Sequence, residues 1–239
     1  MKLISIIIPI RDEAETIGYL LDEIKQQISK VPDYLFEIIV VLDHCRDNSE
    51  AIVKEKQVYI CYNNKKPGKG YAVITGLLKS KGDIVIILDG DCSHDPRYIP
   101  DFIEAVSNGA YLVIGSRAKG GSDEYEIIRL LGNAIFTFLL DLFFSLSLTD
   151  GLNGYRALRR ELLNNYQYRS RGFEIEIEFI YSALINGYSI REIPCHERER
   201  MGGRMKSRTF IDGFKFFIAI LKWGIKFRLL KLLKSCFLL

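Results

Sequence analysis

Two aspartates separated by one glycine form the stretch of the chain most suggestive of chemistry. Asp89 and Asp91 flank Gly90 directly after the apolar, mostly β-branched run 84–88, which is typical of a buried strand. Two carboxylates this close repel each other unless a cation neutralises them. Oxygen ligands suit Mg²⁺ or Mn²⁺, which one or two carboxylates hold together with substrate phosphates. The stretch therefore predicts a metal site for a diphosphate, although a solvated acidic turn has the same short pattern.

The elements around this stretch indicate how distant side chains are brought together. Asp95 and Pro96 are typical of a helix start, with an N-cap side chain and proline at the first helical position. The first half of the chain alternates strands with helices, and we expect the strands at 3–8, 35–42, 58–62, 83–88 and 110–115. This pattern predicts an α/β fold, with a mostly parallel twisted sheet and helices on both faces. Because such sheets bind ligands at the carboxyl ends of their strands, residues that follow different strands should share a pocket.

Composition places the chain among globular proteins. It has 239 residues, of which 48% are hydrophobic and 26% charged, and a net charge of +3. This length suits one large domain, or one domain with a tail. The five cysteines show no CxxC spacing, so we expect reduced thiols and no zinc site. The apolar run 3–10 is short and has no small-residue cleavage site, so we expect no signal peptide.

Beyond Gly120, long apolar stretches replace the strand pattern. Residues 130–149 are long enough to cross a membrane, but Asp141 near the middle would cost roughly 2.5–3.5 kcal/mol on insertion. We expect an amphipathic or buried helix there, one that can lie on a bilayer. Residues 174–186 are predicted to form a helix with an acidic start. Residues 192–208 place many cations around two glycines, which is typical of a loop that closes on phosphate.

The C-terminal segment is basic and rich in aromatic residues. Residues 196–239 contain eleven Lys or Arg and three Asp or Glu, a net charge of +8. A helix of this kind can lie in the headgroup plane of an anionic bilayer. Packing on the rest of the chain, or in a dimer interface, would suit the same pattern. No known nucleic-acid-binding motif accompanies the charges, so we expect no nucleic-acid partner.

Taken together, the motifs resemble the family 2 glycosyltransferases, and within them the polyprenyl-phosphate glycosyltransferases typified by dolichol-phosphate mannose synthase. The similarity runs through residues 3–208. The segments that carry it follow the family's order: IIIPIRDEAETI, IVVLDHCRDNSEAI, NKKPGKGYAVITGL, LDGDCSHDP, VIGSR, DGLNGYRALRRE and GFEIEIEFI. The resemblance implies a GT-A-like nucleotide-sugar-binding fold, with a catalytic domain at 1–208 and a basic amphipathic helical tail at 209–239, which is expected to associate with a membrane.

The same resemblance implies roles for individual residues. Contacts to the nucleotide sugar are expected from Pro9, Arg11, Glu13, Val41, Asp43, Lys69, Asp89, Gly90, Asp91 and Ser93. The metal is expected on Asp89 and Asp91, and the acceptor phosphate on Arg117 and Arg129. The residues expected to act in catalysis are Asp91, Arg117, Arg200 and Lys206. The last two keep an Arg-x-x-Gly-x-x-Lys spacing through Gly203. Glu178 stands in the family's shared glutamate position.

Three positions depart from the family pattern. Arg11 replaces the usual tyrosine, Leu42 replaces the first aspartate of a pair, and Ser93 stands where mannose synthases often have a glutamine. These departures leave the base and the sugar of the donor open, and they do not affect the Asp-Gly-Asp pair.

The resemblance implies an inverting, Mg²⁺- or Mn²⁺-dependent transfer of a hexose from a nucleoside diphosphate sugar, GDP-mannose or UDP-glucose, to a polyprenyl phosphate. An ionised lipid phosphate needs positioning more than a strong base. The implied location is peripheral, on the cytoplasmic face of a membrane, with a homo-oligomer or a small membrane subunit as further partners to consider. One alternative is a non-lipid acceptor such as a polysaccharide, which would need Glu178 or Asp91 as a base. Another is an inactive membrane-bound adaptor, against which the intact Asp89 and Asp91 count.

Overall fold

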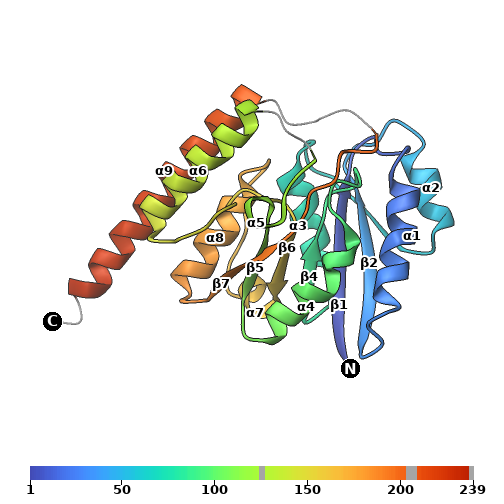
Figure 1. Cartoon of the computed structure of the whole chain (residues 1–239), viewed down its shortest axis with the longest axis horizontal. Coiled ribbons are helices and arrows are strands. Elements are labelled where there is room, and N and C mark those ends of the chain that lie inside the picture. Colours follow the sequence, from blue (N-terminus) through green and yellow to red (C-terminus); the bar gives the residue numbers. More distant parts are fainter. Residues whose placement is uncertain (124–126, 203–208, 237–239) are drawn as a thin grey trace.

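A seven-stranded sheet covered by helices on both faces forms the body of the protein (Figure 1). The computed structural model describes residues 1–123, 127–202 and 209–236. Its strands are β1 (Lys2–Ile10), β2 (Tyr34–Leu42), β3 (Tyr59–Tyr62), β4 (Ile84–Ile87), β5 (Leu112–Ser116), β6 (Arg156–Arg159) and β7 (Ile190–Pro194). Its helices are α1 (Ile17–Ile28), α2 (Ser49–Glu55), α3 (Lys69–Lys79), α4 (Ile99–Ser107), α5 (Arg117–Gly120), α6 (Ile127–Phe144), α7 (Arg160–Asn164), α8 (Ile175–Ile185) and α9 (Thr209–Cys236), with a 3-10 turn, η1 (Pro96–Tyr98), before α4.

The strands lie in the order β3-β2-β1-β4-β6-β5-β7, and all neighbours are parallel except those of β6. The predicted α/β fold with a mostly parallel sheet is thus confirmed. The expectation that the strand pattern stops near Gly120 is wrong, because β6 and β7 complete the sheet. Strand β6 is hard to recognise in the sequence because it is basic, yet its Arg156 is only 1% exposed. Its guanidinium donates to the backbone carbonyls of Gly151, Asn153 and Glu176, which makes the burial of the charge tolerable.

Alternate residues of β1 build two hydrophobic cores, one on each face of the sheet. Ile6 and Ile8 pack in the core that includes residues of α1 and α4, whereas Ile7 packs in the core that includes residues of α3 and α8. Burial on both faces explains why β1 reads as a nearly continuous apolar run. The strand predicted at 3–8 ends two residues early, since β1 extends to Ile10.

The segment between β1 and α1 differs from the sequence prediction in a way that shapes the site. The pattern predicts that Asp12 caps a helix near Glu13, but α1 begins at Ile17. Asp12 instead has a φ of 52°, and its carboxylate accepts a hydrogen bond of 2.7 Å from the backbone N–H of Arg46. This turn directly follows the carboxyl end of β1. It places Arg11 and Glu13 at the edge of the sheet, where both line the cavity described below.

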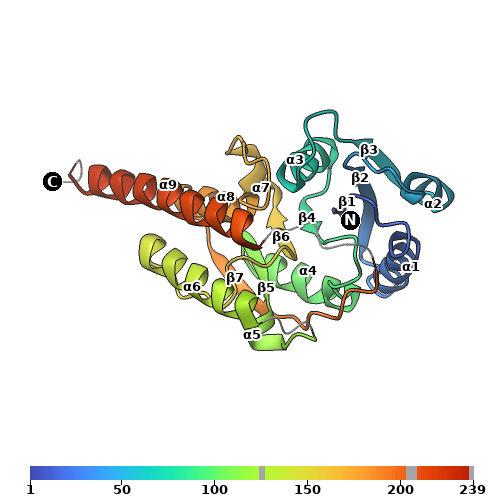
Figure 2. The same ribbon diagram turned by 90° about the horizontal axis from the view of Figure 1, so that it is seen from above.

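Helices α6 and α9 lie side by side and project from the body of the molecule (Figures 1 and 2). Two ring pairs join them, Phe136 with Phe216 at 6.0 Å and Phe144 with Phe227 at 5.6 Å between centroids. Trp223 of α9 is buried in the core on the α3 side of the sheet. The predicted domain boundary after residue 208 stays a prediction, and the described part of α9 is packed against the rest of the chain.

Candidate active site

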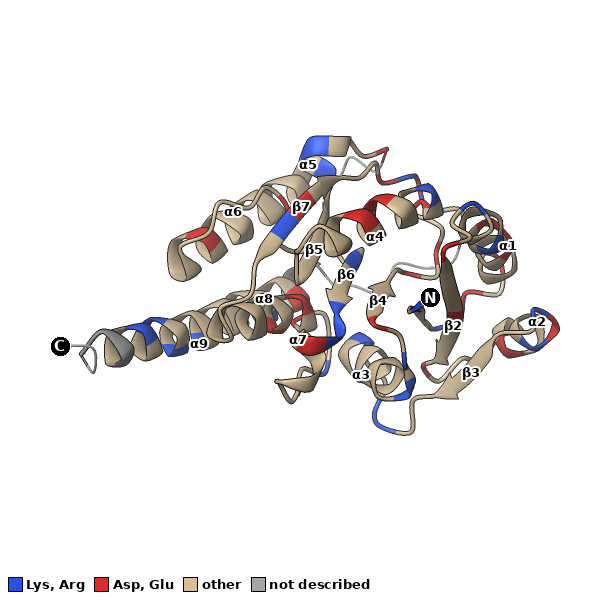
Figure 3. Ribbon diagram, turned by 90° about the horizontal axis from the view of Figure 1, so that it is seen from below, with Lys and Arg blue, Asp and Glu red and all other residues tan. Residues whose placement is uncertain are grey.

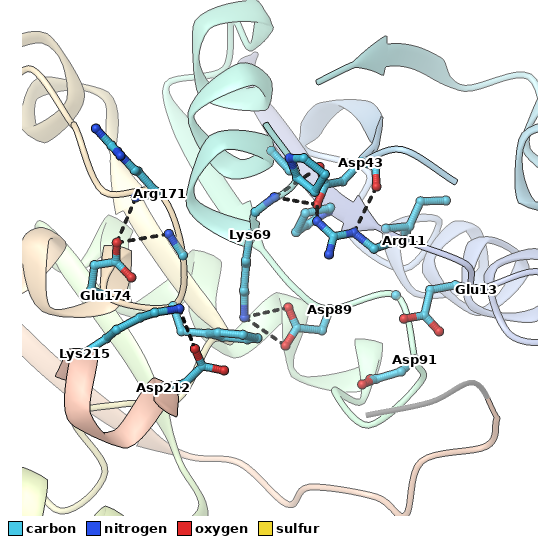
Figure 4. A pocket seen from close by; sticks show the side chains of 18 of the residues that line it. Arg11, Glu13, Asp43, Lys69, Asp89, Asp91, Arg171, Glu174, Asp212 and Lys215 are labelled. Atoms are coloured by element: carbon cyan, nitrogen blue, oxygen red, sulfur yellow. Dashed lines mark hydrogen bonds and ion pairs between the residues drawn. The ribbon is translucent and has the colours of Figure 1, made fainter. Parts of the chain in front are cut away.

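A cavity of about 400 Å³ lies at the carboxyl ends of β1, β2 and β4 (Figure 4). Its other walls come from the start of α3, the loop before α8 and the first two turns of α9. Nine of the residues predicted from the sequence line it: Pro9, Arg11, Glu13, Asp43, Lys69, Asp89, Gly90, Asp91 and Arg200. This is the edge at which open α/β sheets bind ligands. The structure therefore brings most of the predicted donor residues into one place.

The backbone of the Asp-Gly-Asp turn is fixed by close packing. A Cβ atom on Gly90 would lie 2.5 Å from Cγ2 of Ile10, so only glycine fits at this position. The backbone N–H of Asp89 donates to Nδ1 of His94 at 3.0 Å, and the His94 ring stacks on Tyr155 at 5.0 Å between centroids. These contacts hold the turn from behind, so that both carboxylates are presented to the cavity (Figure 4).

Asp91 is held by a serine on one side and an arginine on the other. Its Oδ1 accepts hydrogen bonds from the Ser93 backbone N–H at 3.1 Å and from Ser93 Oγ at 2.7 Å. Its Oδ2 lies 2.9 Å from Nη2 of Arg200. Arg200 reaches this position because the chain around it crosses the turn, where the backbone N–H of Arg198 donates to the Ser93 carbonyl at 2.9 Å. Ser93, predicted to contact the donor, orients Asp91 in this structure.

Asp89 forms a buried ion-pair cluster with a lysine and a second carboxylate. Nζ of Lys69 lies 2.8 Å from Oδ1 of Asp89 and 3.2 Å from Oε1 of Glu176. Burial favours the neutral carboxyl, but the attraction of Lys69 outweighs it and lowers the pKa of Asp89 to about 2. Burial likewise opposes the charge on Lys69, yet Asp89 and Glu176 together raise its pKa. The pKa of Glu176 is raised, mainly by burial. Asp89 is therefore ionised at neutral pH.

Sequence reasoning missed Glu176 and singled out Glu178, two residues further along α8. Glu178 is fully buried and accepts hydrogen bonds from the Tyr166 hydroxyl and from the backbone N–H groups of Arg169 and Ser170. It holds the loop before α8 and does not line the cavity. A signal for Glu176 was present, since α8 is apolar on every side and a charge inside such a helix must find a partner.

At the other end of the cavity, Asp43 is surrounded by donors from the protein. Its carboxylate accepts hydrogen bonds from the guanidinium of Arg11, from Nδ2 of Asn63 at 2.7 Å and from the backbone N–H of Gly68 at 3.0 Å. The close approach of Gly68 leaves no room for a side chain, because a Cβ atom would meet the carbonyl oxygen of Arg171. This end of the cavity therefore presents the ion pair of Arg11 and Asp43.

The sequence did not predict which residues form the cavity wall opposite Asp43. Glu174 accepts hydrogen bonds from the backbone N–H groups of Arg171 and Gly172, at 2.9 and 3.1 Å. On α9, Lys215 lies 2.9 Å from Asp212, and both side chains face the cavity (Figure 4). The sequence predicts a membrane-associated tail for this part of α9 and gives no sign that its first two turns line the cavity.

The two arginines predicted to bind an acceptor phosphate lie outside the cavity. Arg117 donates from Nε and Nη2 to the two carboxylate oxygens of Asp150, at 2.6 and 2.8 Å, and its Nη1 lies 3.4 Å from Glu197. Burial opposes the charge on the Asp150 carboxyl, but Arg117 lowers its pKa. Asn133 donates to the same Asp150 at 2.9 Å and stands one turn along α6 from Arg129. Asp150 thus joins Arg117 to the part of α6 that carries Arg129.

Two further predicted residues are not placed at the cavity. The side chain of Val41 is fully buried in the core on the α3 side of the sheet. Lys206, and Gly203 before it, lie outside the described residues. Their assigned roles stay predictions.

The carboxylates of Asp89 and Asp91 fit a divalent cation that is shared with a ligand. Within residues 1–123, 127–202 and 209–236, no group of three or more His, Cys, Asp or Glu side chains forms a complete metal site. Mg²⁺ and similar ions need only one or two carboxylates when phosphate oxygens and water complete the shell. Both acidic side chains are exposed to the cavity, and each is now neutralised by a basic side chain.

The fold and the sequence are those of a glycosyltransferase. Residues 5–167 match the model of a family described as glycosyl transferase family 2, and the chain belongs to this family. The predicted family and enzyme class are therefore confirmed.

Two relatives align in sequence with most of the chain. It is 30% identical over 232 residues to a dolichol-phosphate mannosyltransferase of Pyrococcus furiosus, covering 92% of this chain and 64% of that protein. The chain thus spans slightly less than two thirds of that relative's length. It is 28% identical over 243 residues to a polyprenol monophosphomannose synthase of Mycolicibacterium smegmatis, covering 94% of this chain and 88% of that protein.

Solved structures share the fold. The glucosyl-3-phosphoglycerate synthase of Mycobacterium tuberculosis, in complex with Mn²⁺, uridine diphosphate and phosphoglyceric acid, superimposes with a TM-score of 0.73 at 22% identity. The match covers 93% of this chain and 78% of that one. At this identity the likeness concerns the GT-A-like fold alone.

Proposed function

We propose that this glycosyltransferase transfers a hexose from a nucleoside diphosphate sugar to a polyprenyl phosphate at a membrane surface. The observation that carries the proposal is the cavity in which Asp89 and Asp91 lie side by side, with the ion pair of Arg11 and Asp43 at one end. The names of the two sequence relatives, both polyprenyl-phosphate mannosyltransferases, support the choice of a lipid phosphate as acceptor.

The donor half of the reaction is assigned to the cavity. Asp89 and Asp91 would hold Mg²⁺ or Mn²⁺, which acts as a Lewis acid towards a leaving diphosphate. Arg200 stands beside Asp91 and adds positive charge where the diphosphate would lie. Arg11 and Asp43 offer a donor and an acceptor at the nucleoside end. The cavity would thereby hold the donor by its diphosphate and its nucleoside.

The acceptor half is assigned to Arg117 and Arg129. A guanidinium binds phosphate oxygens in a fork, and Asp150 holds that of Arg117 in one orientation. The longer contact of Arg117 with Glu197, at 3.4 Å, is the one that an incoming phosphate would replace. A phosphate oxygen is already ionised at neutral pH, so alignment of the two substrates is the main task of the protein. One displacement at the anomeric carbon inverts its configuration.

The apolar face of α6 and α9 is the proposed membrane contact. The 18 residues of α6 have a mean hydropathy of 1.8 and only 17% of them are buried, so this helix is long and apolar enough to cross a membrane by length and composition. Figure 3 shows Lys and Arg spaced along α9, whereas most of α6 is uncharged. Exposed cations beside exposed apolar side chains suit a peripheral position on an anionic surface such as the cytoplasmic leaflet.

The proposal is tested by supplying labelled GDP-mannose or UDP-glucose together with a polyprenyl phosphate and Mn²⁺. We expect label in lipid that organic solvent extracts, and none when either the lipid phosphate or the metal is omitted. Label that appears only in a water-soluble glycan would favour the non-lipid acceptor instead. Binding of the donor without any transfer to either class of acceptor would favour the inactive adaptor.

A further inference from the structure

Each carboxylate of the Asp-Gly-Asp turn already has a cation from the chain itself. Lys69 lies 2.8 Å from Oδ1 and 3.0 Å from Oδ2 of Asp89, and Arg200 lies 2.9 Å from Asp91 (Figure 4 draws the pair of Lys69 and Asp89). The side chain of Lys69 is 12% exposed, so solvent and salt screen its attraction to Asp89 only weakly. A divalent cation that approaches Asp89 must therefore compete with the ammonium group.

A third carboxylate is placed to receive this ammonium group. Oε1 of Glu176 lies 3.2 Å from Nζ of Lys69, and the residue is 3% exposed. Its Oε2 is buried and has no hydrogen-bond partner among the residues that the structure describes. A buried carboxylate oxygen left in this way costs free energy, which a closer approach of Lys69 would recover. The cluster has room because residue 154 is glycine: a Cβ atom there would lie 2.6 Å from Nζ.

We propose that Lys69 is an exchangeable counter-ion that moves between Asp89 and Glu176. It holds Asp89 while the cavity contains no ligand, and it turns to Glu176 and to the donor diphosphate when a divalent cation takes Asp89. Arg200 exchanges Asp91 for the diphosphate in the same way. The inference rests on the proposed function, because it takes a metal-bound nucleoside diphosphate as the ligand of the cavity.

The exchange couples the two ligands. Metal alone must break ion pairs for which the protein has only partial replacements, whereas a diphosphate supplies new anionic partners for Lys69 and Arg200. Each ligand should therefore strengthen the binding of the other by the same factor, and couplings of this kind are typically about 5–150-fold. Lys69 thus affects the metal through Asp89, and it contacts the diphosphate directly once the metal is bound.

The experiment is a titration of Mn²⁺, followed by the electron paramagnetic resonance signal of the free ion, with and without GDP or UDP. In Lys69→Met we expect Mn²⁺ alone to bind at least about 5-fold more tightly than in the wild type, the low end of such couplings. The enhancement by the nucleoside diphosphate should shrink correspondingly. Lys66→Met, which removes an exposed lysine of the same loop, should change neither quantity. Unchanged or weaker binding of Mn²⁺ alone by folded Lys69→Met would overturn the exchange.

A second variant tests the exchange if Lys69→Met folds poorly. Glu176→Gln leaves Lys69 with Asp89 as its main anionic partner, so Mn²⁺ alone should bind more weakly than in the wild type. Equal or tighter binding by folded Glu176→Gln would overturn the exchange. In the double variant the effect of Glu176→Gln should become much smaller, because the ammonium group that it redirects is gone. An equal effect in both backgrounds would show that Glu176 acts through its charge alone, which contradicts the exchange.

The titration distinguishes failure of the proposed function from failure of the exchange. If the wild type binds no Mn²⁺ even with GDP or UDP, the proposed function fails and the exchange fails with it. If the wild type binds Mn²⁺ with the nucleoside diphosphate but Lys69→Met leaves the coupling unchanged, only the exchange fails.

Discussion

The cavity and the apolar face of α6 and α9 differ in how their charges are held. In the cavity, Asp89 and Asp91 each lie within hydrogen-bonding distance of a cation, and their side chains are 29% and 8% exposed. On α9, Lys222 and Lys226 are exposed and lie near the Trp223 ring, at 4.5 and 5.5 Å from its centroid. Paired, shielded charges select a ligand by geometry, whereas exposed cations on an apolar surface attract anionic lipid over a range that salt controls. A mutation should therefore be able to impair the function of one region and leave that of the other intact.

The largest expected effect is the loss of transfer in Asp91→Ala. Without this carboxylate, the charge that develops on the leaving diphosphate is no longer stabilised, and the rate of hexose transfer should fall by about 10³-fold or more. Binding to anionic vesicles should stay unchanged, as should the far-UV circular dichroism. Asp33→Ala, at an exposed aspartate, is the control and should have wild-type activity. Appreciable transfer by Asp91→Ala in Mg²⁺ or Mn²⁺ would contradict the role assigned to the cavity and hence its distinction from the apolar face.

Arg117→Lys should produce the next largest effect, at the proposed junction between the cavity and the membrane. A lysine cannot bind phosphate in a fork or keep both contacts to Asp150, so KM for the polyprenyl phosphate should rise by about 10-fold, about 1.4 kcal/mol. KM for the nucleotide sugar should stay within about 2-fold. Arg191→Lys, on the exposed side of β7, is the matched control. A change confined to the donor KM would contradict the role assigned to Arg117.

Phe138→Asp should weaken membrane binding while leaving the cavity intact. Phe138 is 65% exposed on α6, and burial of such a side chain in lipid is worth about 1.5–3 kcal/mol, or roughly 10- to 100-fold in vesicle partitioning. The control is Leu78→Asp on α3, where the side chain is 79% exposed but far along the chain from the helix pair. Co-sedimentation with anionic vesicles measures the effect. Equal losses in both variants would mean that net charge, and not the α6 face, decides binding.

The smallest expected effect concerns the segment that carries Arg200. A hydrogen bond to Asp123 raises the pKa of His196 above its ordinary value of 6.5. The protonated form therefore contributes stability that is complete below pH 6.5 and is lost as the pH rises through the raised pKa. Because the pair is largely exposed, His196→Gln should lower the free energy of unfolding by less than about 1 kcal/mol in acid, and by nothing at pH 9. Urea unfolding across this range measures it, and a larger loss at pH 9 than in acid would contradict the sign.

The first half of the molecule could be predicted from local patterns. Apolar runs define β1, β2 and β4, and a parallel sheet collects their carboxyl ends, so Arg11, Asp43 and the Asp89–Asp91 pair were expected together before any contact was known. The pattern could not predict which residue pairs with each charged side chain. That Lys69 lies between Asp89 and Glu176 depends on the approach of α3 to the loop before α8, a contact between segments about a hundred residues apart.

The second half was harder because its elements depend on distant partners. Strand β6 is basic and short, and it becomes a strand by pairing antiparallel with β4 and β5. The first two turns of α9 look like the start of a tail, yet Asp212 and Lys215 line the cavity. Arg117 was correctly noticed at the end of β5, but nothing in the local sequence indicates its pairing with Asp150, 33 residues away.

That Asp89 and Asp91 share a divalent cation with a diphosphate is tested most directly by thermal unfolding of the wild type and Asp91→Ala. A ligand that binds only the folded protein raises Tm, so GDP or UDP with Mn²⁺ should raise Tm of the wild type well above the value with the nucleotide and EDTA. Asp91→Ala should show no such rise. The same Tm with and without Mn²⁺, or an equal rise in the variant, would contradict the site.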